Sequence, residues 1–179
     1  MLNLSSLASD CGITHTTARR WISILEASFL VLLLRPHHVN LGKRLIKSPK
    51  LYFLDTGLLC FLLGIRSPEE IVHHAQRGAI FETLVVSELM KNFLHRGDLP
   101  DLFFWRDSTG REVDFVIDLG KQRIGIEAKS AQTIAADFFD HLRYWRRLSG
   151  RSRPTCALIY GGDRRYVDDD VAVHPWHVL

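Results

Sequence analysis

The sequence predicts a protein of the mixed α/β (α+β) class, with a small helical domain followed by a larger domain that contains a β-sheet. The helical domain is predicted by apolar residues that recur at helical spacing between positions 4 and 25. The sheet is predicted by a change of apolar spacing, which is helical over residues 79–94 and alternates over residues 112–129. The length of 179 residues is enough for one large domain or two small ones.

The first domain is expected over residues 1–66 and begins with a helix-turn-helix pattern. Residues 4–11 and residues 14–25 each carry one apolar stripe at helical spacing, so each segment predicts a helix. Gly12 lies between the two segments and favours a tight turn, because glycine readily takes the left-handed conformation that ends many helices.

Two strands are expected after these helices, over residues 30–34 and 50–54, with turn residues 36–40 between them. A helix, a turn, a second helix and a two-stranded wing together indicate a winged-helix domain. Winged helices can bind DNA or contact other proteins, and the sequence leaves both possibilities open.

Three residues of the second helix are candidates for contact with DNA. Arg19, Arg20 and Ser23 lie away from the apolar stripe that contains Ala18 and Trp21, so we expect them to point outward. The two arginines could bind phosphate groups. An ordinary hydrated helix face explains them equally well.

A basic run in the expected wing adds two further candidates, Lys43 and Arg44, and continues through Lys47 and Lys50. Such a run could reach the phosphates of DNA, or it could keep the wing in solution.

The second domain is expected over residues 67–179 and has the order helix, three strands, helix, strand, strand. Its long first helix covers residues 79–94 and is broken after Gly97 by a turn sequence. The next helix is marked by apolar residues at helical spacing from Phe138 to Leu148. The expected strands are residues 102–105, 112–119, 123–129 and 156–160, with one more at 171–173.

Three carboxylates and one lysine of this domain form a candidate metal site. Glu127 and Lys129 are two residues apart in one strand and share a face, and a hairpin can set Asp114 beside Glu127. Glu82 lies on an otherwise apolar helix face, where a carboxylate is costly unless it is paired or bound to a metal. We expect the strand residues to face the helix of Glu82 and to bind Mg²⁺ or Mn²⁺. Cross-strand salt bridges on a hydrated sheet face explain the strand residues equally well.

These segments resemble the PD-(D/E)XK nuclease superfamily. The resemblance is carried by the helix with Glu82, by residues 112–117 (Glu-Val-Asp-Phe-Val-Ile) and by residues 126–130 (Ile-Glu-Ala-Lys-Ser). It implies a restriction-endonuclease-like αβββαβ core, a divalent metal and hydrolysis of phosphodiesters. It also implies that Asp114 and Glu127 are metal ligands. Glu82 would act directly or through water, and Lys129 would be catalytic.

Nearly the whole chain also resembles the C-terminal half of prokaryotic AAA-type ATPases that carry the DUF4143 domain. The resemblance is carried by residues 7–26, residues 49–59 (Pro-Lys-Leu-Tyr-Phe-Leu-Asp-Thr-Gly-Leu-Leu), residues 77–82 and the two strand motifs. In that family a P-loop ATPase precedes this region, which implies an ATPase domain or ATPase subunit as partner. The sequence contains no G-x-x-x-x-G-K-[ST], so we expect a fragment or truncated gene product that binds no nucleotide by itself.

Composition places the chain among soluble globular proteins, with 46% apolar and 24% charged residues. Its longest apolar runs are far shorter than the roughly 20 residues that span a bilayer, and no signal peptide is expected. Three cysteines without a C-x-x-C pair indicate reduced thiols in a cytoplasmic protein. The net charge of +3 permits nucleic-acid binding without requiring it.

Three functions follow as hypotheses. The first is a metal-dependent nuclease that acts on DNA. The second is a catalytically inactive DNA- or protein-binding module that partners an ATPase, and the third is a transcription regulator that works through the winged helix. A metal titration would separate the first from the second, and loss of DNA binding on replacement of Arg19 and Arg20 would support the third.

Overall fold

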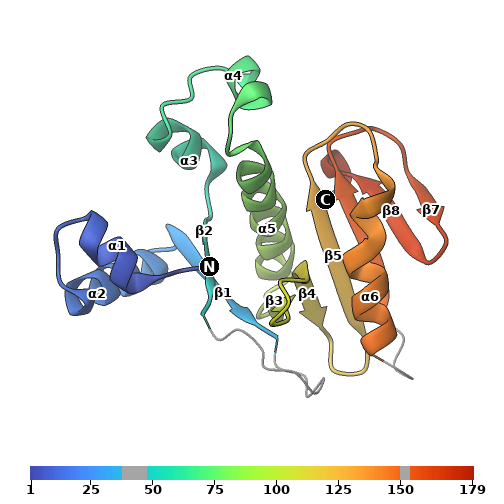
Figure 1. Cartoon of the computed structure of the whole chain (residues 1–179), viewed down its shortest axis with the longest axis horizontal. Helices are drawn as coiled ribbons and strands as arrows, with labels where there is room; N and C mark the ends of the chain where they lie inside the picture. The colour runs from blue at the N-terminus through green and yellow to red at the C-terminus, as the bar shows by residue number, and fades with distance from the viewer. Residues whose placement is uncertain (38–47, 150–153) are drawn as a thin grey trace.

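Eight strands form one mixed sheet with helices on both of its faces (Figure 1). The computed structural model describes residues 1–37, 48–149 and 154–179. The strand order is β2-β1-β3-β4-β5-β6-β8-β7. The mixed α/β class predicted from the sequence is therefore confirmed.

The helices and strands follow one another along the chain in the order given below. In chain order the elements are α1 (Leu4–Asp10), α2 (His15–Ala27), β1 (Val31–Pro36), β2 (Lys50–Phe53), α3 (Thr56–Leu62), α4 (Pro68–His73), α5 (Arg77–His95), β3 (Leu102–Arg106), β4 (Glu112–Asp118), β5 (Arg123–Lys129), η1 (Ala136–Phe139), α6 (Asp140–Leu148), β6 (Thr155–Tyr160), β7 (Tyr166–Asp168), β8 (Val171–Pro175) and η2 (Trp176–Val178). From α5 to β6 the order is helix, three strands, helix, strand. Among the described helices none is long and apolar enough to cross a membrane.

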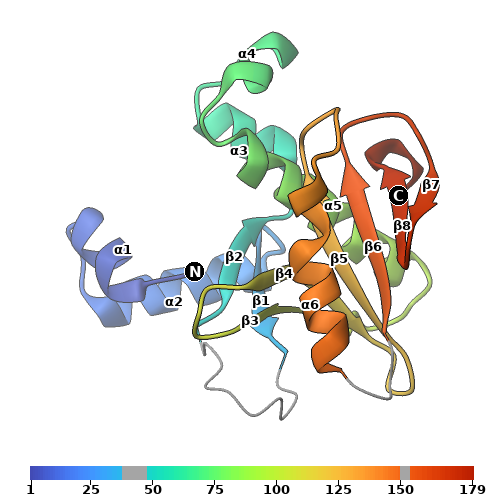
Figure 2. The same ribbon diagram turned by 45° about the vertical axis from the view of Figure 1, so that its right-hand side comes forward.

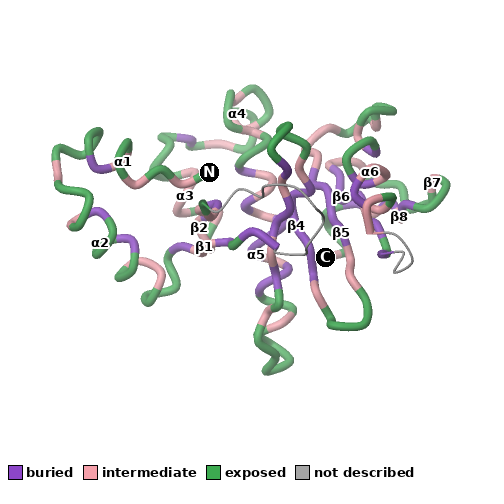
Figure 3. The backbone as a smooth tube through the Cα atoms, turned by 60° about the horizontal axis from the view of Figure 1, so that its bottom comes forward, coloured by how far each residue is buried: buried purple, intermediate pink, exposed green. Residues whose placement is uncertain are grey.

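A side chain caps the beginning of each of the first two helices. The Asn3 side chain accepts hydrogen bonds from two backbone N–H groups of α1, and Thr14 Oγ1 accepts one from the Thr17 N–H at 3.1 Å. Gly12 has a φ of 64°, which makes the turn between the helices. Most of their residues are exposed, and they lie at one end of the molecule, beyond β1 and β2 (Figure 3).

The expected wing is also the edge of the main sheet. β1 pairs antiparallel with β2, as a hairpin would, but it also pairs in parallel with β3 at Arg35 and Pro36. The hairpin therefore extends the sheet of the second region. Residues 38–47, which include most of the expected turn, lie outside the described residues.

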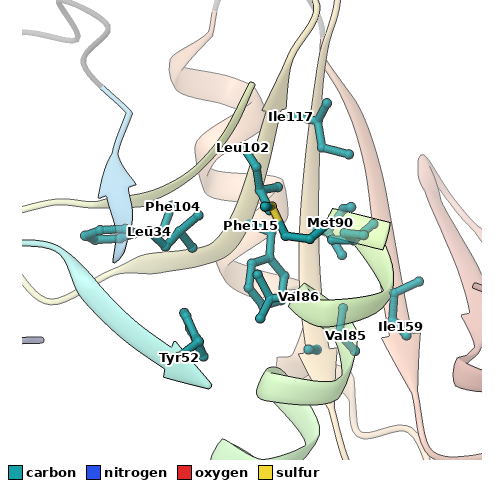
Figure 4. Close-up of a cluster of buried hydrophobic side chains, with 13 residues drawn as sticks. Leu34, Tyr52, Val85, Val86, Met90, Leu102, Phe104, Phe115, Ile117 and Ile159 are labelled. Atoms are coloured by element: carbon teal, nitrogen blue, oxygen red, sulfur yellow. The ribbon is translucent and has the colours of Figure 1, made fainter. Parts of the chain in front are cut away.

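The helices α5 and α6 cover opposite faces of the sheet (Figure 2), and an apolar cluster lies beneath each of them. On one face α5 packs its buried residues, such as Val86 and Met90, against Phe115 of β4 (Figure 4). On the other face α6 packs Leu142 and Trp145 against the sheet. Each cluster removes apolar surface from water, which stabilises the fold by about 25 cal/mol for each Å² buried. The sheet is therefore fixed from both sides at the strands that carry the candidate site.

Strand β4 contains one residue more than β3 in the segment where the two strands pair. Phe103 pairs with Val116 and Trp105 pairs with Val113, so β3 advances two residues while β4 advances three. Such a β-bulge bends a strand and redirects a side chain. Asp114 lies in the bulge.

Candidate functional site

The structure brings the four residues of the predicted site together. Glu82 lies in the second turn of α5, Asp114 in the bulge of β4, and Glu127 and Lys129 at the carboxyl end of β5. Asp114 Oδ2 accepts a hydrogen bond from the Ala128 N–H at 3.0 Å. Lys129 Nζ donates to Glu127 Oε2 at 2.9 Å. Charge interactions connect Asp114 with both other carboxylates.

The expected orientation of the β5 residues was wrong. Ile126 and Ala128 pack into the cluster on α5, so Glu127, which alternates with them, faces α6. His141 Nδ1 of α6 lies 3.8 Å from Glu127 Oε1. The reason is that the apolar side chains of β5 must face the apolar stripe of α5. The charged side chains of the candidate site therefore come from both faces of the sheet and meet at the bulge.

Two residues of β2 complete the site and were not identified from the sequence. Lys50 Nζ lies 3.6 Å from Glu82 Oε2 and 3.7 Å from Asp114 Oδ1, and it forms an ion pair with Glu112 Oε1. The Tyr52 hydroxyl donates a hydrogen bond of 2.8 Å to Glu82 Oε2. From the sequence, Lys50 belongs to a basic run that could reach DNA phosphates or keep the wing in solution, but only 8% of it is exposed.

One signal could have indicated these residues. Lys50 and Tyr52 are two apart in a strand and share a face, and Tyr52 continues the apolar pattern of that strand. A lysine on the inward face of a strand needs a buried anion. Its partners Glu112 and Asp114 follow the same spacing in β4.

Burial and like charge make the carboxylates of this cluster hard to ionise. Burial raises the pKa of Glu127 well above its ordinary value, and the neighbouring Asp114 carboxyl raises it further. The pKa of Glu82 is also raised, first by burial and then by the charge of Asp114. Burial and Asp114 therefore favour the protonated form of Glu127, and the neighbouring Lys129 opposes them.

The lysines of the cluster are held in their charged form. Burial lowers the pKa of Lys50, but attraction to Asp114, Glu82 and Glu112 outweighs it, so the pKa is raised. The same balance raises the pKa of Lys129, with Glu127 as its main attractive partner. Burial and the charge of Glu82 also raise the pKa of the Tyr52 hydroxyl, which stays a hydrogen-bond donor.

The donor atoms present suit a divalent ion held by two carboxylates. Glu127 Oε1 is buried, and in the part of the chain that the structure describes it has no hydrogen-bond partner. Asp114 lies beside it, whereas Glu82 Oε2 is engaged by Tyr52 and Lys50. Within that part, no three His, Cys, Asp or Glu side chains are arranged to hold a metal ion. Mg²⁺ fits such a site because it commonly keeps several waters and takes one or two carboxylates.

The predicted DNA contacts on α2 lie on an exposed face. Arg19, Arg20 and Ser23 are all exposed, and Ser23 Oγ donates a hydrogen bond to the Arg19 carbonyl. Trp21, which we expected in the apolar stripe, is 53% exposed. The other two predicted contacts, Lys43 and Arg44, lie outside the described residues.

A second basic surface lies beside the site and was not predicted. The loops after β5 and β6 enclose a hollow of about 910 Å³ whose lining includes Arg164, Arg165 and Tyr166. The Gly161 N–H donates to the Lys129 carbonyl at 3.0 Å, which joins this hollow to the end of β5. The Tyr160 hydroxyl hydrogen-bonds with the backbone of Arg164 and fixes the loop.

Residues 77–179, which contain the carboxylates and Lys129, match the family described as "Domain of unknown function (DUF4143)". The chain belongs to this family. The resemblance to the DUF4143 domain predicted from the sequence is therefore confirmed. Residues 1–69 match a separate family, "Domain of unknown function (DUF8612)", so Lys50 and Tyr52 lie outside the DUF4143 region.

Two mycobacterial proteins are similar to this DUF4143 chain. They are "Uncharacterized protein Rv2008c" of Mycobacterium tuberculosis and "Uncharacterized protein Mb2031c" of Mycobacterium bovis, each 31% identical over 170 residues. The similarity covers 94% of this chain and 36% of each relative, so the chain spans about a third of their length. No solved structure matches the sequence.

Proposed function

We propose that the chain is a nuclease-like DNA-processing module that hydrolyses phosphodiesters with Mg²⁺ or Mn²⁺. One observation carries the proposal: Glu127 is 2% exposed, its Oε1 has no hydrogen-bond partner among the described residues, and it adjoins Asp114 and Lys129. A buried carboxylate in this state is costly, and such costs are concentrated at functional sites.

The element order supports a restriction-endonuclease-like core within this proposal. The order from α5 to β6 is the αβββαβ order that we expected, with Asp114 on the second strand and Glu127 and Lys129 on the third. The helices α1 and α2 and the β1–β2 hairpin would then be a winged helix attached to that core.

In the proposed reaction Asp114 and Glu127 hold the divalent ion. The bound ion would supply an activated water and polarise a phosphate oxygen. Lys129 donates to Glu127 from a position one pleat away, where its ammonium can stabilise negative charge that develops on the phosphate. Glu82, held by Tyr52, keeps Lys50 charged beside Asp114.

The hollow beside the site favours a polyanionic substrate. Among the described residues, Arg164 and Arg165 form no ion pair within 4.0 Å, and both are exposed next to the exposed ring of Tyr166. Arginines that follow a phosphate backbone together with an aromatic ring that stacks on a base are typical of single-strand binding. We therefore propose that the DNA strand runs through this hollow.

Cleavage assays test the proposed function. The purified chain should cut single- or double-stranded DNA in Mg²⁺ or Mn²⁺ and should not cut it in chelator. Glu127→Ala and Lys129→Met should lose cleavage, whereas Lys91→Met, which changes an exposed lysine paired with Glu88, should keep it. Cleavage by a Glu127→Ala, Lys129→Ala double variant would mean a contaminant or a different active site.

A second candidate is an inactive DNA- or protein-binding module that partners an ATPase. It is favoured by an apolar hollow of about 540 Å³ between α3, α4 and α5, next to the exposed side chains of Phe61, Leu62 and Val72. Such a surface suits a protein contact, and the relatives extend well beyond this chain. DNA binding that is equal in Mn²⁺ and in chelator, without cleavage, would favour this candidate.

A further inference from the structure

Lys50 is a buried lysine whose ammonium group has three carboxylates around it. Nζ forms an ion pair with Glu112 Oε1 and lies within 4 Å of oxygens of Glu82 and Asp114. The ammonium also lies 5.6 Å from the ring centre of Phe104, a distance typical of a cation–π contact. Its position is therefore fixed by negative charge and by an aromatic ring together.

The lysine and its partners come from different parts of the chain. Lys50 belongs to β2, in the region matched by DUF8612, whereas the three carboxylates belong to the region matched by DUF4143. Arg106 of β3, in the second region, pairs with Glu112 Oε2 at 3.1 Å, so the charge that the first region adds acts mainly on Glu82 and Asp114. Without the Lys50 ammonium those two carboxylates would repel each other more strongly, and burial makes that repulsion costly.

Asp114 is common to two halves of the cluster. Its Oδ1 lies 3.7 Å from Lys50 Nζ, and its carboxyl group also interacts with Glu127. The cluster therefore offers two places for a positive charge. Lys50 fills one of them. The other adjoins Glu127 Oε1, which has no hydrogen-bond partner in the described part of the chain, although His141 Nδ1 lies 3.8 Å away and Lys129 occupies Oε2 of the same carboxylate.

We propose that the Lys50 ammonium takes the place of one cation, so that the site binds a single divalent ion at Asp114 and Glu127. Many phosphodiester-cleaving sites use two ions that lie about 3.5–4 Å apart. Here a covalently attached ammonium replaces one of them and cannot be removed by a chelator. This inference rests on the proposed function, but its test needs no cleavage.

The test counts the Mn²⁺ ions that one chain binds, from the paramagnetic resonance signal of the Mn²⁺ that stays free. The wild-type chain should bind one ion and Lys50→Gln should bind two, because the vacated carboxylates then need a second cation. Lys50→Arg keeps the charge and should bind one. Lys91→Gln is the matched control, since it removes an exposed lysine from an ion pair with Glu88, and it should also bind one.

The outcomes separate this inference from the proposed function. One ion bound by both the wild type and Lys50→Gln would overturn the inference and leave the function standing. No ion in the wild type would overturn both the inference and the metal-dependent function, whatever Lys50→Gln binds. If Lys50→Gln unfolds in chelator, saturating Mn²⁺ should restore its circular dichroism, and failure to refold would overturn the inference.

Discussion

At the scale of single residues, Glu127 shows what strand spacing can predict and what it cannot. The two-residue spacing correctly linked Glu127 with Lys129, because alternation is a local property of a strand. The spacing did not show which helix Glu127 faces, because that depends on which side of the sheet takes the apolar residues. Lys50 was missed since its partners lie more than 30 residues away and only the sheet order brings them together.

Replacement of Glu127 by glutamine should stabilise the metal-free protein at neutral pH. The folded-state pKa of Glu127 is raised above its ordinary value of 4.5, so the folded state binds the proton more tightly than the unfolded chain. Stability from this group is fully present below pH 4.5 and is lost as the pH rises through the folded pKa. Glu127→Gln removes that loss. In chelator, its free energy of unfolding should therefore exceed that of the wild type by an amount that increases above pH 4.5 and reaches about 1–3 kcal/mol at pH 7.

Urea unfolding in chelator at a series of pH values measures this difference. Glu88→Gln is the control, because Glu88 is paired with Lys91 at the surface and should show little pH-dependent difference. A Glu127→Gln variant that is less stable than the wild type at pH 7 would contradict the cost assigned to the buried carboxylate.

Divalent ions should raise the melting temperature of the wild-type chain. Binding to the folded state alone adds about 2.7 kcal/mol at an ion concentration of 100 Kd. Because the pKa of Glu127 is raised, protons compete with the ion for this carboxylate, so the rise should increase with pH. Asp114→Asn should abolish the rise, as measured by differential scanning calorimetry in Mn²⁺ and in chelator. Equal melting temperatures of the wild type in both solutions would exclude a metal site.

At the scale of elements, periodicity predicted the helices and strands around the site but not the bulge in β4. The long helix and the three-strand meander are present, although α5 begins at Arg77, earlier than expected. The bulge that holds Asp114 depends on the pairing of β3 with β4, which a single-strand pattern does not contain. Trp21 fits the stripe of α2 by spacing yet is 53% exposed, and spacing within one helix does not show whether another element covers it.

The loop between β6 and β7 should contribute to DNA binding more than α2 does. Arg164→Ala together with Arg165→Ala removes two charges from the hollow beside the site. The slope of log affinity against log salt should then become shallower by about 1.4, which is two contacts at about 0.7 each for a single strand. Fluorescence anisotropy with labelled single-stranded DNA gives this slope. The reverse result, a shallower slope only in an Arg19→Ala, Arg20→Ala variant, would place the DNA on α2.

At the scale of the whole molecule, the sheet runs through the boundary that we predicted between residues 66 and 67. The two family matches also separate near this point, at residues 69 and 77. Yet β1 pairs with β3, and Ser87 Oγ of α5 donates a hydrogen bond to the Leu54 carbonyl at 2.7 Å. The site itself depends on this union, because Lys50 and Tyr52 reach it from the first region.

Unfolding of the described sheet should therefore be a single cooperative transition. Leu34 of β1 tests this, because it belongs to the first region by sequence but is 1% exposed in the cluster with α5 and β4. Leu34→Ala should cost about 2–5 kcal/mol. It should shift the urea midpoints of circular dichroism and tryptophan fluorescence together, since Trp105 and Trp145 are buried in the second region.

Leu62→Ala, at a 60% exposed position, should change neither midpoint appreciably. If Leu34→Ala lowers only part of the dichroism transition and leaves the tryptophan midpoint unchanged, the two regions unfold independently, and the site must then be able to lose Lys50 without unfolding.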